Sequence, residues 1–307
     1  MNGAAKAIGR PRSAARLSDY LELMKPELTG LSVLTALCGF YLATSGAFDG
    51  ALFVHLALGT ALLGGGAGAL NQFIEREYDG LMKRTERRPL PSGRLDARSC
   101  LIFGITISAA GLVELAVFTN LLTGFLGAVT FASYIFLYTP LKRITPHSTL
   151  VGAVPGALPP VMGWTAARNQ LTPEAAVLFA ILFCWQMPHF LSLAWMYRRD
   201  YARAGFKILT VDDPAGRRTS RQIFWYSAGL VPASLAPSLA GMTGVASVAG
   251  AALLSLGFLA IGVLLVKESN HPRVGFPGEF TSASRRLFFG SLVYLPCLML
   301  LMALDKV

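Results

Sequence analysis

Long apolar stretches alternate with short polar ones along almost the whole chain. Nine stretches are each long enough, at about 18 or more residues, to cross roughly 30 Å of hydrocarbon at about 1.5 Å per residue. They cover residues 27–46, 51–71, 99–119, 121–141, 148–166, 174–196, 222–241, 244–266 and 286–304. The pattern predicts an all-α, polytopic membrane protein of about nine transmembrane helices.

Lysine and arginine residues collect on one side of this predicted bundle. If the N-terminus is cytoplasmic, the cytoplasmic segments hold five, seven, two, seven and four of the 27 basic residues, and the outer segments hold only Arg168 and Lys306. Cytoplasmic loops of membrane proteins carry such an excess of Lys and Arg. We therefore expect a cytoplasmic N-terminus and a C-terminus on the outer face. One missed or extra helix would mix the two groups, so the distribution also supports the helix count.

Composition agrees with a membrane protein, since 53% of the 307 residues are hydrophobic and only 14% are charged. The net charge of +10 is dispersed over loops, which favours a surface facing anionic membrane lipid over one that binds nucleic acid. Residues 1–24 are predicted to form a basic cytoplasmic tail, and residues 25–307 a single transmembrane domain. We expect a bacterial inner membrane; the Arg-rich tail leaves a mitochondrial inner membrane as the alternative.

Two predicted cytoplasmic loops, residues 72–98 and 197–221, carry seven basic residues each. In the first, the segment from Glu75 to Arg88, both included, holds five basic and four acidic residues. Prolines interrupt the predicted spans 148–166 and 222–241. A broken helix is tolerated in a membrane where protein surrounds it or where it lines a cavity. We expect both helices to bend around a central cavity that opens to the cytoplasm beside the two loops.

Asn71, Glu75 and Asp79 are spaced four residues apart where the second predicted helix reaches the cytoplasm. This spacing places them on one helical face. Mg²⁺ prefers such hard oxygens, and it completes its shell with water and substrate phosphate. Four cations that suit phosphate oxygens follow in the chain: Lys83, Arg84, Arg87 and Arg88. Two interpretations explain the segment: a magnesium diphosphate site, or a solvated loop whose opposite charges pair with each other.

Further polar residues favour the diphosphate interpretation. Tyr138 and Lys142, with Arg143 beside them, end the fourth predicted helix on the cytoplasmic side and could hold the same diphosphate, although a Tyr-Lys pair is also an ordinary interface anchor. Gln186 and His189 lie inside the sixth predicted helix, where polar groups are costly and become candidates for substrate binding.

The loop 197–221 repeats the mixed charge of the first loop. It contains Asp200 together with four cations: Arg198, Arg199, Arg203 and Lys207. Asp200 would share nearly one helical face with Gln186 and His189 if the helix continued that far. Two helices would then present oxygen and nitrogen ligands to one cavity.

Three segments carry a resemblance to the UbiA superfamily of intramembrane prenyltransferases: "NQFIEREYDGLMKRTERRPLPSG", "YTPLKRITPHSTLVGAVPGALPPVMGW" and "WQMPHFLSLAWMYRRDYARAGFKIL". The resemblance extends from about residue 25 to about residue 220, and the last three spans match only in hydropathy. The superfamily pattern Asn-x-x-x-Asp-x-x-x-Asp falls on Asn71, Glu75 and Asp79, with Glu replacing the middle Asp. Its second aspartate-rich motif is represented only by His189 and Asp200, which resembles the heme-specific branch.

The resemblance implies transfer of the farnesyl group of farnesyl diphosphate to a vinyl group of heme b, which gives heme O. It implies Mg²⁺ on Asn71, Glu75 and Asp79, with Lys142 as a further catalytic residue. It implies that the two substrates contact nine other residues: Lys83, Arg84, Arg87, Arg88, Tyr138, Arg143, His189, Arg199 and Asp200. A heme A synthase or a terminal oxidase would be the downstream partner.

Three alternatives stay open at this point. A prenyltransferase of the same superfamily could act on another lipophilic acceptor. A secondary transporter would also show broken helices, but its polar residues should lie near the middle of the bilayer, whereas these collect at the cytoplasmic ends. A membrane scaffold would leave the charged loops as topology signals alone.

Overall fold

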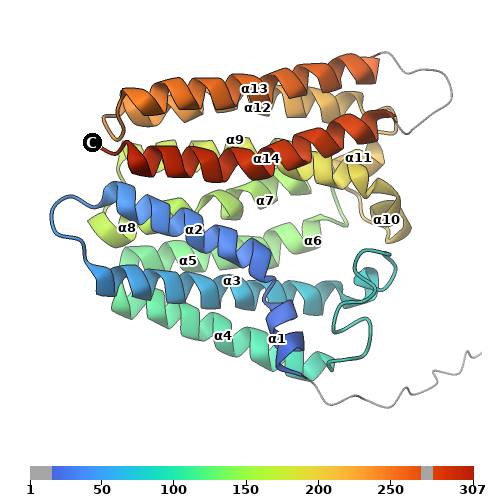
Figure 1. Ribbon diagram of the computed structural model, residues 1–307. Coiled ribbons are helices and arrows are strands. Elements are labelled where there is room, and N and C mark those ends of the chain that lie inside the picture. The colour runs from blue at the N-terminus through green and yellow to red at the C-terminus, as the bar shows by residue number, and fades with distance from the viewer. Residues whose placement is uncertain (1–15, 271–278) are drawn as a thin grey trace, which may run out of the picture.

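The computed structural model describes residues 16–270 and 279–307, which form a bundle of helices (Figure 1). Residues 1–15, most of the predicted basic tail, and residues 271–278 of the last predicted cytoplasmic segment lie outside the described residues. The long helices are α2 (Pro26–Ala43), α3 (Gly50–Asp79), α4 (Ala97–Phe118), α5 (Leu121–Ala132), α9 (Pro173–Met196), α12 (Arg217–Leu239), α13 (Val245–Asn270) and α14 (Glu279–Leu304). The shorter ones are α1 (Leu17–Leu23), η1 (Ser133–Tyr138), α6 (Thr139–Leu141), α7 (Ser148–Ala157), α8 (Pro159–Arg168), α10 (Arg198–Arg203) and α11 (Leu209–Asp212).

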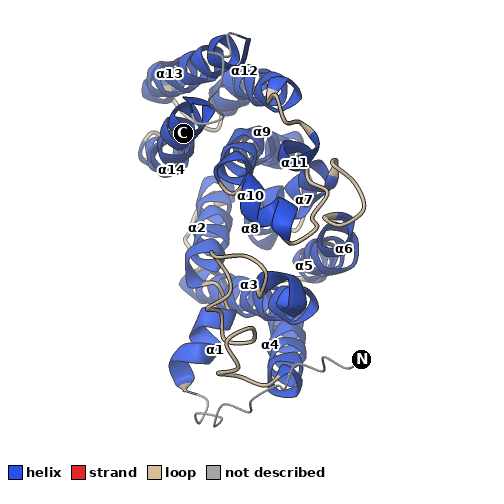
Figure 2. Cartoon of the chain, turned by 90° about the vertical axis from the view of Figure 1, so that its right-hand side faces the viewer, coloured by secondary structure: helices blue, strands red, loops and turns tan. Residues whose placement is uncertain are grey.

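Within these described ranges, eight helical segments are long and apolar enough to cross a membrane. They are α2, α3, α4, the run Leu121–Leu141, the run Ser148–Arg168, α9, α13 and α14. Helix α12, the seventh predicted span, is less apolar because it begins with Arg217, Arg218, Arg221 and Gln222 and because serine and proline residues follow. It nevertheless packs along α9 and α13 (Figures 1 and 2). The prediction of an all-α integral membrane protein with about nine long helices is therefore confirmed.

The prolines of the two interrupted spans have different effects. Pro159 begins α8 directly after a break at Leu158, so the predicted span 148–166 is divided into α7 and α8. Proline suits the first turn of a helix, where its missing N–H would have no partner in any case. Pro232 and Pro237 instead lie inside the continuous helix α12. No described residue of α12 lines the cavity reported below, so the expectation that this helix bends around it is wrong.

Helices α2 and α8 touch backbone to backbone in the second half of α2. A Cβ atom added to Gly163 would lie 1.8 Å from the Ala36 carbonyl oxygen, and one added to Gly39 would lie 2.1 Å from that of Pro160. Neither contact leaves room for a side chain, and small residues permit this kind of close packing in membranes. This contact anchors α2 on α8, and Lys25, just before α2, lines the cavity reported below.

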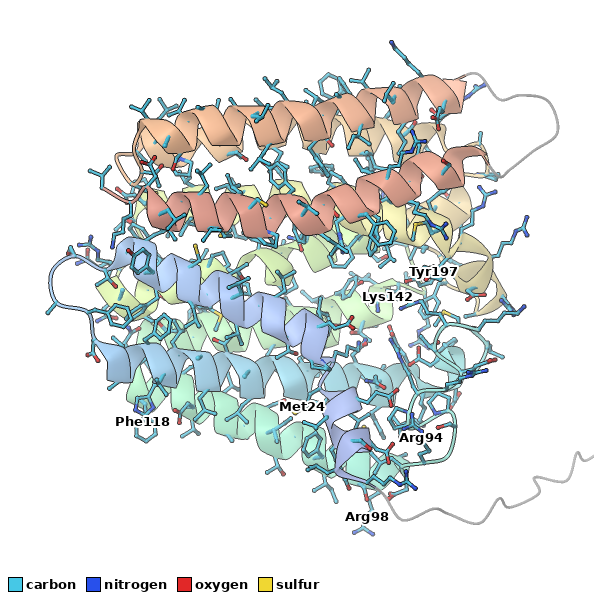
Figure 3. All side chains as sticks on the ribbon, in the orientation of Figure 1. Met24, Arg94, Arg98, Phe118, Lys142 and Tyr197 are labelled. Carbon is cyan, nitrogen blue, oxygen red and sulfur yellow. The ribbon has the colours of Figure 1, made fainter. Side chains whose placement is uncertain are left out.

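The polar segments collect at one end of the bundle, which we call the charged end: loop 80–96, α6, α10 and α11 (Figure 1). Arg94, Lys142 and Tyr197 lie toward this end, and Phe118 lies at the opposite end (Figure 3). Helix α1 also contacts the charged end, because Arg94 of loop 80–96 forms ion pairs with Asp19 and with Glu22. The two loops that the charge pattern singled out therefore meet in space.

Candidate active site

The last turns of α3 hold the predicted metal-binding edge. Asn71, Glu75 and Asp79 are all buried, with exposed fractions of 1%, 6% and 1%. They share one face because α3 continues without a break to Asp79. Buried carboxylates cost free energy unless they are paired and hydrogen-bonded, so their partners show what the site is built to hold.

Each of these three residues is bonded to a different cation. The contacts are Lys25 Nζ to Asn71 Oδ1 at 2.6 Å, Lys142 Nζ to Glu75 Oε1 at 2.8 Å, and one Arg88 nitrogen to both oxygens of Asp79 at 2.8 and 2.9 Å. The cations come from three separate parts of the chain: the start of α2, the end of α6 and loop 80–96. Packing thus places three basic side chains against one oxygen-rich helix face, each paired with one of the motif residues.

The sequence analysis did not identify Lys25 as a site residue. It was only one of the basic residues that indicate the topology. Its backbone has φ of 50°, an unusual left-handed conformation for a lysine, and this turns the side chain toward α3. Burial, followed by the charges of Arg88 and Lys142, lowers the pKa of Lys25 to about 7, although Glu75 and Asp79 oppose the shift.

Tyr138 and Lys142 lie together as predicted, since the Lys142 ammonium is 4.5 Å from the centre of the Tyr138 ring. Burial alone would lower the pKa of Lys142, but Glu75, with smaller contributions from Tyr138 and Tyr134, reverses this and keeps the group charged. Tyr138 ends the π-helical turn η1, a type of turn that is frequent at functional sites. Arg143 points elsewhere and donates to the Tyr78 hydroxyl at 2.6 Å.

Asp200 connects loop 197–221 to loop 80–96. It accepts a bond from the Arg84 backbone N–H at 3.4 Å and forms an ion pair with Arg203. The Arg84 guanidinium lies over the Tyr197 and Tyr201 rings, with its central carbon 5.2 and 5.9 Å from their centres. These contacts hold loop 80–96 against α10.

The prediction that Gln186, His189 and Asp200 share one helical face is wrong. Helix α9 ends at Met196, and Asp200 belongs to the separate helix α10. Asp200 faces loop 80–96, whereas His189 lies inside the bundle. The side chains of Lys83, Arg87 and Arg199 are exposed at the charged end.

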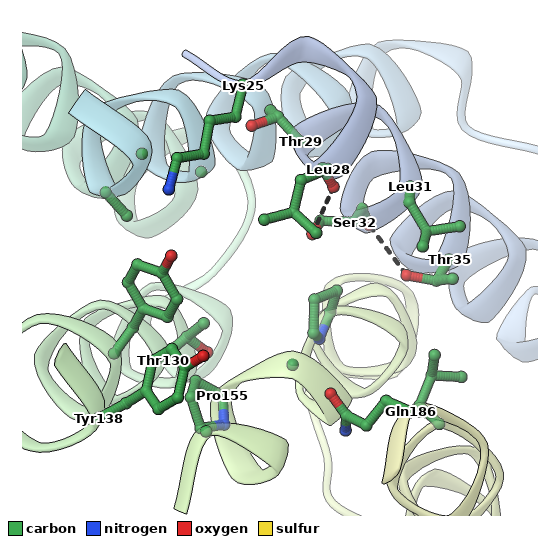
Figure 4. A pocket seen from close by; sticks show the side chains of 18 of the residues that line it. Lys25, Leu28, Thr29, Leu31, Ser32, Thr35, Thr130, Tyr138, Pro155 and Gln186 are labelled. Carbon is green, nitrogen blue, oxygen red and sulfur yellow. Dashed lines mark hydrogen bonds between the residues drawn. The ribbon is translucent and has the colours of Figure 1, made fainter. Parts of the chain in front are cut away.

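A cavity enters the bundle beside the buried motif. Its empty space, including the open mouth, is about 1290 Å³, and its walls are mostly apolar. Lys25 and Tyr138 line one part of it, and Gln186 lines another (Figure 4). His189 is also a lining residue. Lys25 also bonds Asn71, and the Lys142 ammonium lies over the Tyr138 ring. One cation of the site therefore lines the cavity, and a second packs against a residue that lines it.

The donors of the α3 edge fit Mg²⁺ chemically. Two carboxylates and an amide oxygen are available, and this ion usually takes one or two carboxylates with water and substrate phosphate. Among the residues that the structure describes, there is no cluster of three or more His, Cys, Asp or Glu that could hold a metal by itself.

Comparisons with known proteins agree with this architecture. The profile of the UbiA prenyltransferase family matches residues 32–276. A protoheme IX farnesyltransferase from Solibacter usitatus is 47% identical over 94% of this chain and 99% of the relative. One from Koribacter versatilis is 41% identical over 98% of this chain and 97% of the relative.

Two solved structures share the fold at low identity. Digeranylgeranylglyceryl phosphate synthase superimposes with a TM-score of 0.77 at 15% identity, over 94% of this chain and 98% of that one. A UbiA homolog from Archaeoglobus fulgidus, bound to GPP and Mg²⁺, superimposes with a TM-score of 0.63 at 15% identity, over 92% and 99%. The chain belongs to the UbiA prenyltransferase family.

Proposed function

We propose that this protein transfers the farnesyl group of farnesyl diphosphate to a vinyl group of heme b and so produces heme O. The observation that carries the proposal is the set of three buried motif residues, each bonded to its own cation, beside an apolar cavity. The relatives named protoheme IX farnesyltransferase support heme as the acceptor, since they align over nearly the full length.

The diphosphate is expected at the α3 edge. Asn71, Glu75 and Asp79 would hold Mg²⁺, which when bound supplies positive charge that stabilises the leaving diphosphate. Lys25, Lys142 and Arg88 are now bonded to those same residues. In the complex they can turn to phosphate oxygens, where charge develops as the allylic bond breaks. Exposed Lys83, Arg84, Arg87 and Arg199 would attract the diphosphate to the charged end.

The reaction breaks the bond between C1 of the farnesyl group and the diphosphate oxygen, which keeps the electron pair. The allylic cation then bonds to the terminal vinyl carbon of heme b. Water adds to the adjacent carbon and loses a proton, which leaves the hydroxyl group of heme O. The apolar walls of the cavity favour this order because they exclude bulk water until the carbon–carbon bond has formed.

We propose that the charged end faces the cytoplasm of a bacterial cell and that the protein lies in the inner membrane. The excess of basic residues on that side supports this orientation. Its product would pass to a heme A synthase or a terminal oxidase, since heme O is insoluble in water and needs a membrane-bound acceptor.

The acceptor can be tested directly in membranes that contain the protein. They are incubated with farnesyl diphosphate, Mg²⁺ and either heme b or an aromatic quinone precursor, and the products are identified by mass. We expect heme O and no prenylated quinone precursor. Prenylation of the quinone precursor alone would assign the protein to another acceptor of the same family.

A further inference from the structure

His189 on α9 is held by α14, the last helix of the chain. Its Nδ1 lies 2.7 Å from Ser291 Oγ, and one turn earlier Trp185 Nε1 donates to the Ser291 backbone oxygen at 2.8 Å. Two groups of α9 thus converge on a single residue of α14, and Ser291 is completely buried.

The hydrogen bonds of Ser291 determine which nitrogen of His189 carries the proton. Ser291 Oγ lies 2.5 Å from the Phe288 carbonyl oxygen, which can only accept, so the single hydroxyl hydrogen is donated there. The hydroxyl must then accept from His189, which puts the proton of the neutral imidazole on Nδ1. The lone pair is left on Nε2, which has no hydrogen-bond partner among the described residues.

Aromatic rings fix the direction of the imidazole. Trp185 stacks against it with ring centres 5.0 Å apart and planes at 19°, and Phe288 does so at 4.9 Å and 28°. His189 is a lining residue of the cavity, and its Nδ1 is turned to α14. The nitrogen available to a molecule in the cavity is therefore Nε2.

We propose that Ser291 is a positioning residue that orients His189 so that Nε2 ligates the iron of the heme substrate. This proposal rests on the proposed function, because it takes heme b as the acceptor. An imidazole that ligates a metal usually donates its other N–H to a fixed acceptor, and that bond sets the tautomer and raises ligand basicity. Iron ligation would anchor the porphyrin in the same cavity whose other polar groups face the diphosphate.

The test uses the purified full-length protein with ferric heme b and no farnesyl diphosphate. We expect the absorption and resonance Raman spectra to show an axial imidazole ligand. His189→Ala should lose this signature, and added free imidazole should restore it. Ser291→Ala should weaken heme affinity by about 10- to 100-fold, as for other partners of ligating histidines. Ser291→Thr keeps the hydroxyl and should restore the affinity.

Ser255→Ala is the matched control. Ser255 is completely buried in α13 and bonds the Ala251 carbonyl at 2.6 Å, so the change removes a comparable hydroxyl without touching α9. Its heme affinity should equal that of the parent. An imidazole signature that persists in His189→Ala would overturn the ligand assignment. Equal heme affinities in Ser291→Ala and the parent, or in Ser291→Ala and Ser255→Ala, would overturn the role of Ser291.

The heme titration is independent of the transferase assay. A protein that ligates heme through His189 but forms no heme O would refute the proposed function and leave this inference standing. A protein that forms heme O while its spectrum shows no imidazole ligand would support the proposed function and refute this inference.

Discussion

The buried pair of Lys142 and Glu75 can be tested by removing each partner alone and then both together. Their side chains are 13% and 8% exposed, and the nitrogen and oxygen lie 2.8 Å apart. Lys142→Met leaves the Glu75 carboxylate without its partner, and Glu75→Gln leaves the Lys142 ammonium without its partner. Removing one member of a buried ion pair costs about 3–5 kcal/mol, whereas replacing both is often neutral.

The two single changes should not cost the same. In Glu75→Gln the ammonium keeps its contact with the Tyr138 ring at 4.5 Å, which is worth about 0.5–2 kcal/mol. Lys142→Met leaves the carboxylate with only the charge of Lys25, whose pKa is lowered by burial to about 7. We expect Lys142→Met to lower the free energy of unfolding by about 3–5 kcal/mol and Glu75→Gln by about 1 kcal/mol less. The double variant should fall within about 1 kcal/mol of the parent.

The measurement is reversible unfolding of the four proteins in mixed micelles, without substrate or Mg²⁺. A second cycle on Arg218 and Asp212, an exposed pair at 54% and 52%, is the control and should show no measurable coupling. If the losses of the two single variants simply add in the double variant, Lys142 and Glu75 do not act as a pair. The account of a site built from matched buried charges would then be wrong.

Other predictions concern the diphosphate site. Asp79→Asn should reduce transfer at least about 100-fold while the protein stays folded in the membrane, and unchanged activity would remove the metal role of Asp79. Arg88→Lys keeps the charge but loses the planar guanidinium, so KM for farnesyl diphosphate should rise about tenfold, the equivalent of one charge-assisted bond of about 1.5 kcal/mol. Lys25→Met should raise the same KM and Lys25→Arg should raise it less, whereas equal KM values in both variants and the parent would exclude a phosphate contact. Removal of divalent cations with EDTA should stop transfer, and added Mg²⁺ should restore it; activity that survives EDTA would contradict the metal dependence.

Residues on one continuous helix could be predicted from spacing alone. Asn71, Glu75 and Asp79 share a buried face because α3 has no break between them. The same reasoning failed for His189 and Asp200, because α9 ends at Met196 and Asp200 lies in the separate helix α10. Helical periodicity carries no information once a helix has ended, and no proline or glycine marks that end in the sequence.

Contacts between distant segments could not be predicted in this way. Lys25 bonds a residue 46 positions later, and it reaches it through a left-handed backbone conformation and the close packing of α2 on α8. Ser291 lies 102 positions from His189. Hydropathy predicts that its helix crosses the membrane, but not which helix it packs against. Both contacts depend on how helices pack against one another, and that packing is decided by the fit of many side chains together.

The central claim is farnesyl transfer to heme at the edge formed by Asn71, Glu75 and Asp79. The most direct measurement is the mass of the heme recovered from purified protein after incubation with farnesyl diphosphate, Mg²⁺ and heme b, with Asp79→Asn alongside. Our account predicts heme O from the parent protein and unchanged heme b from the variant. Unchanged heme b from a correctly folded parent protein, or equal heme O from both, would contradict it.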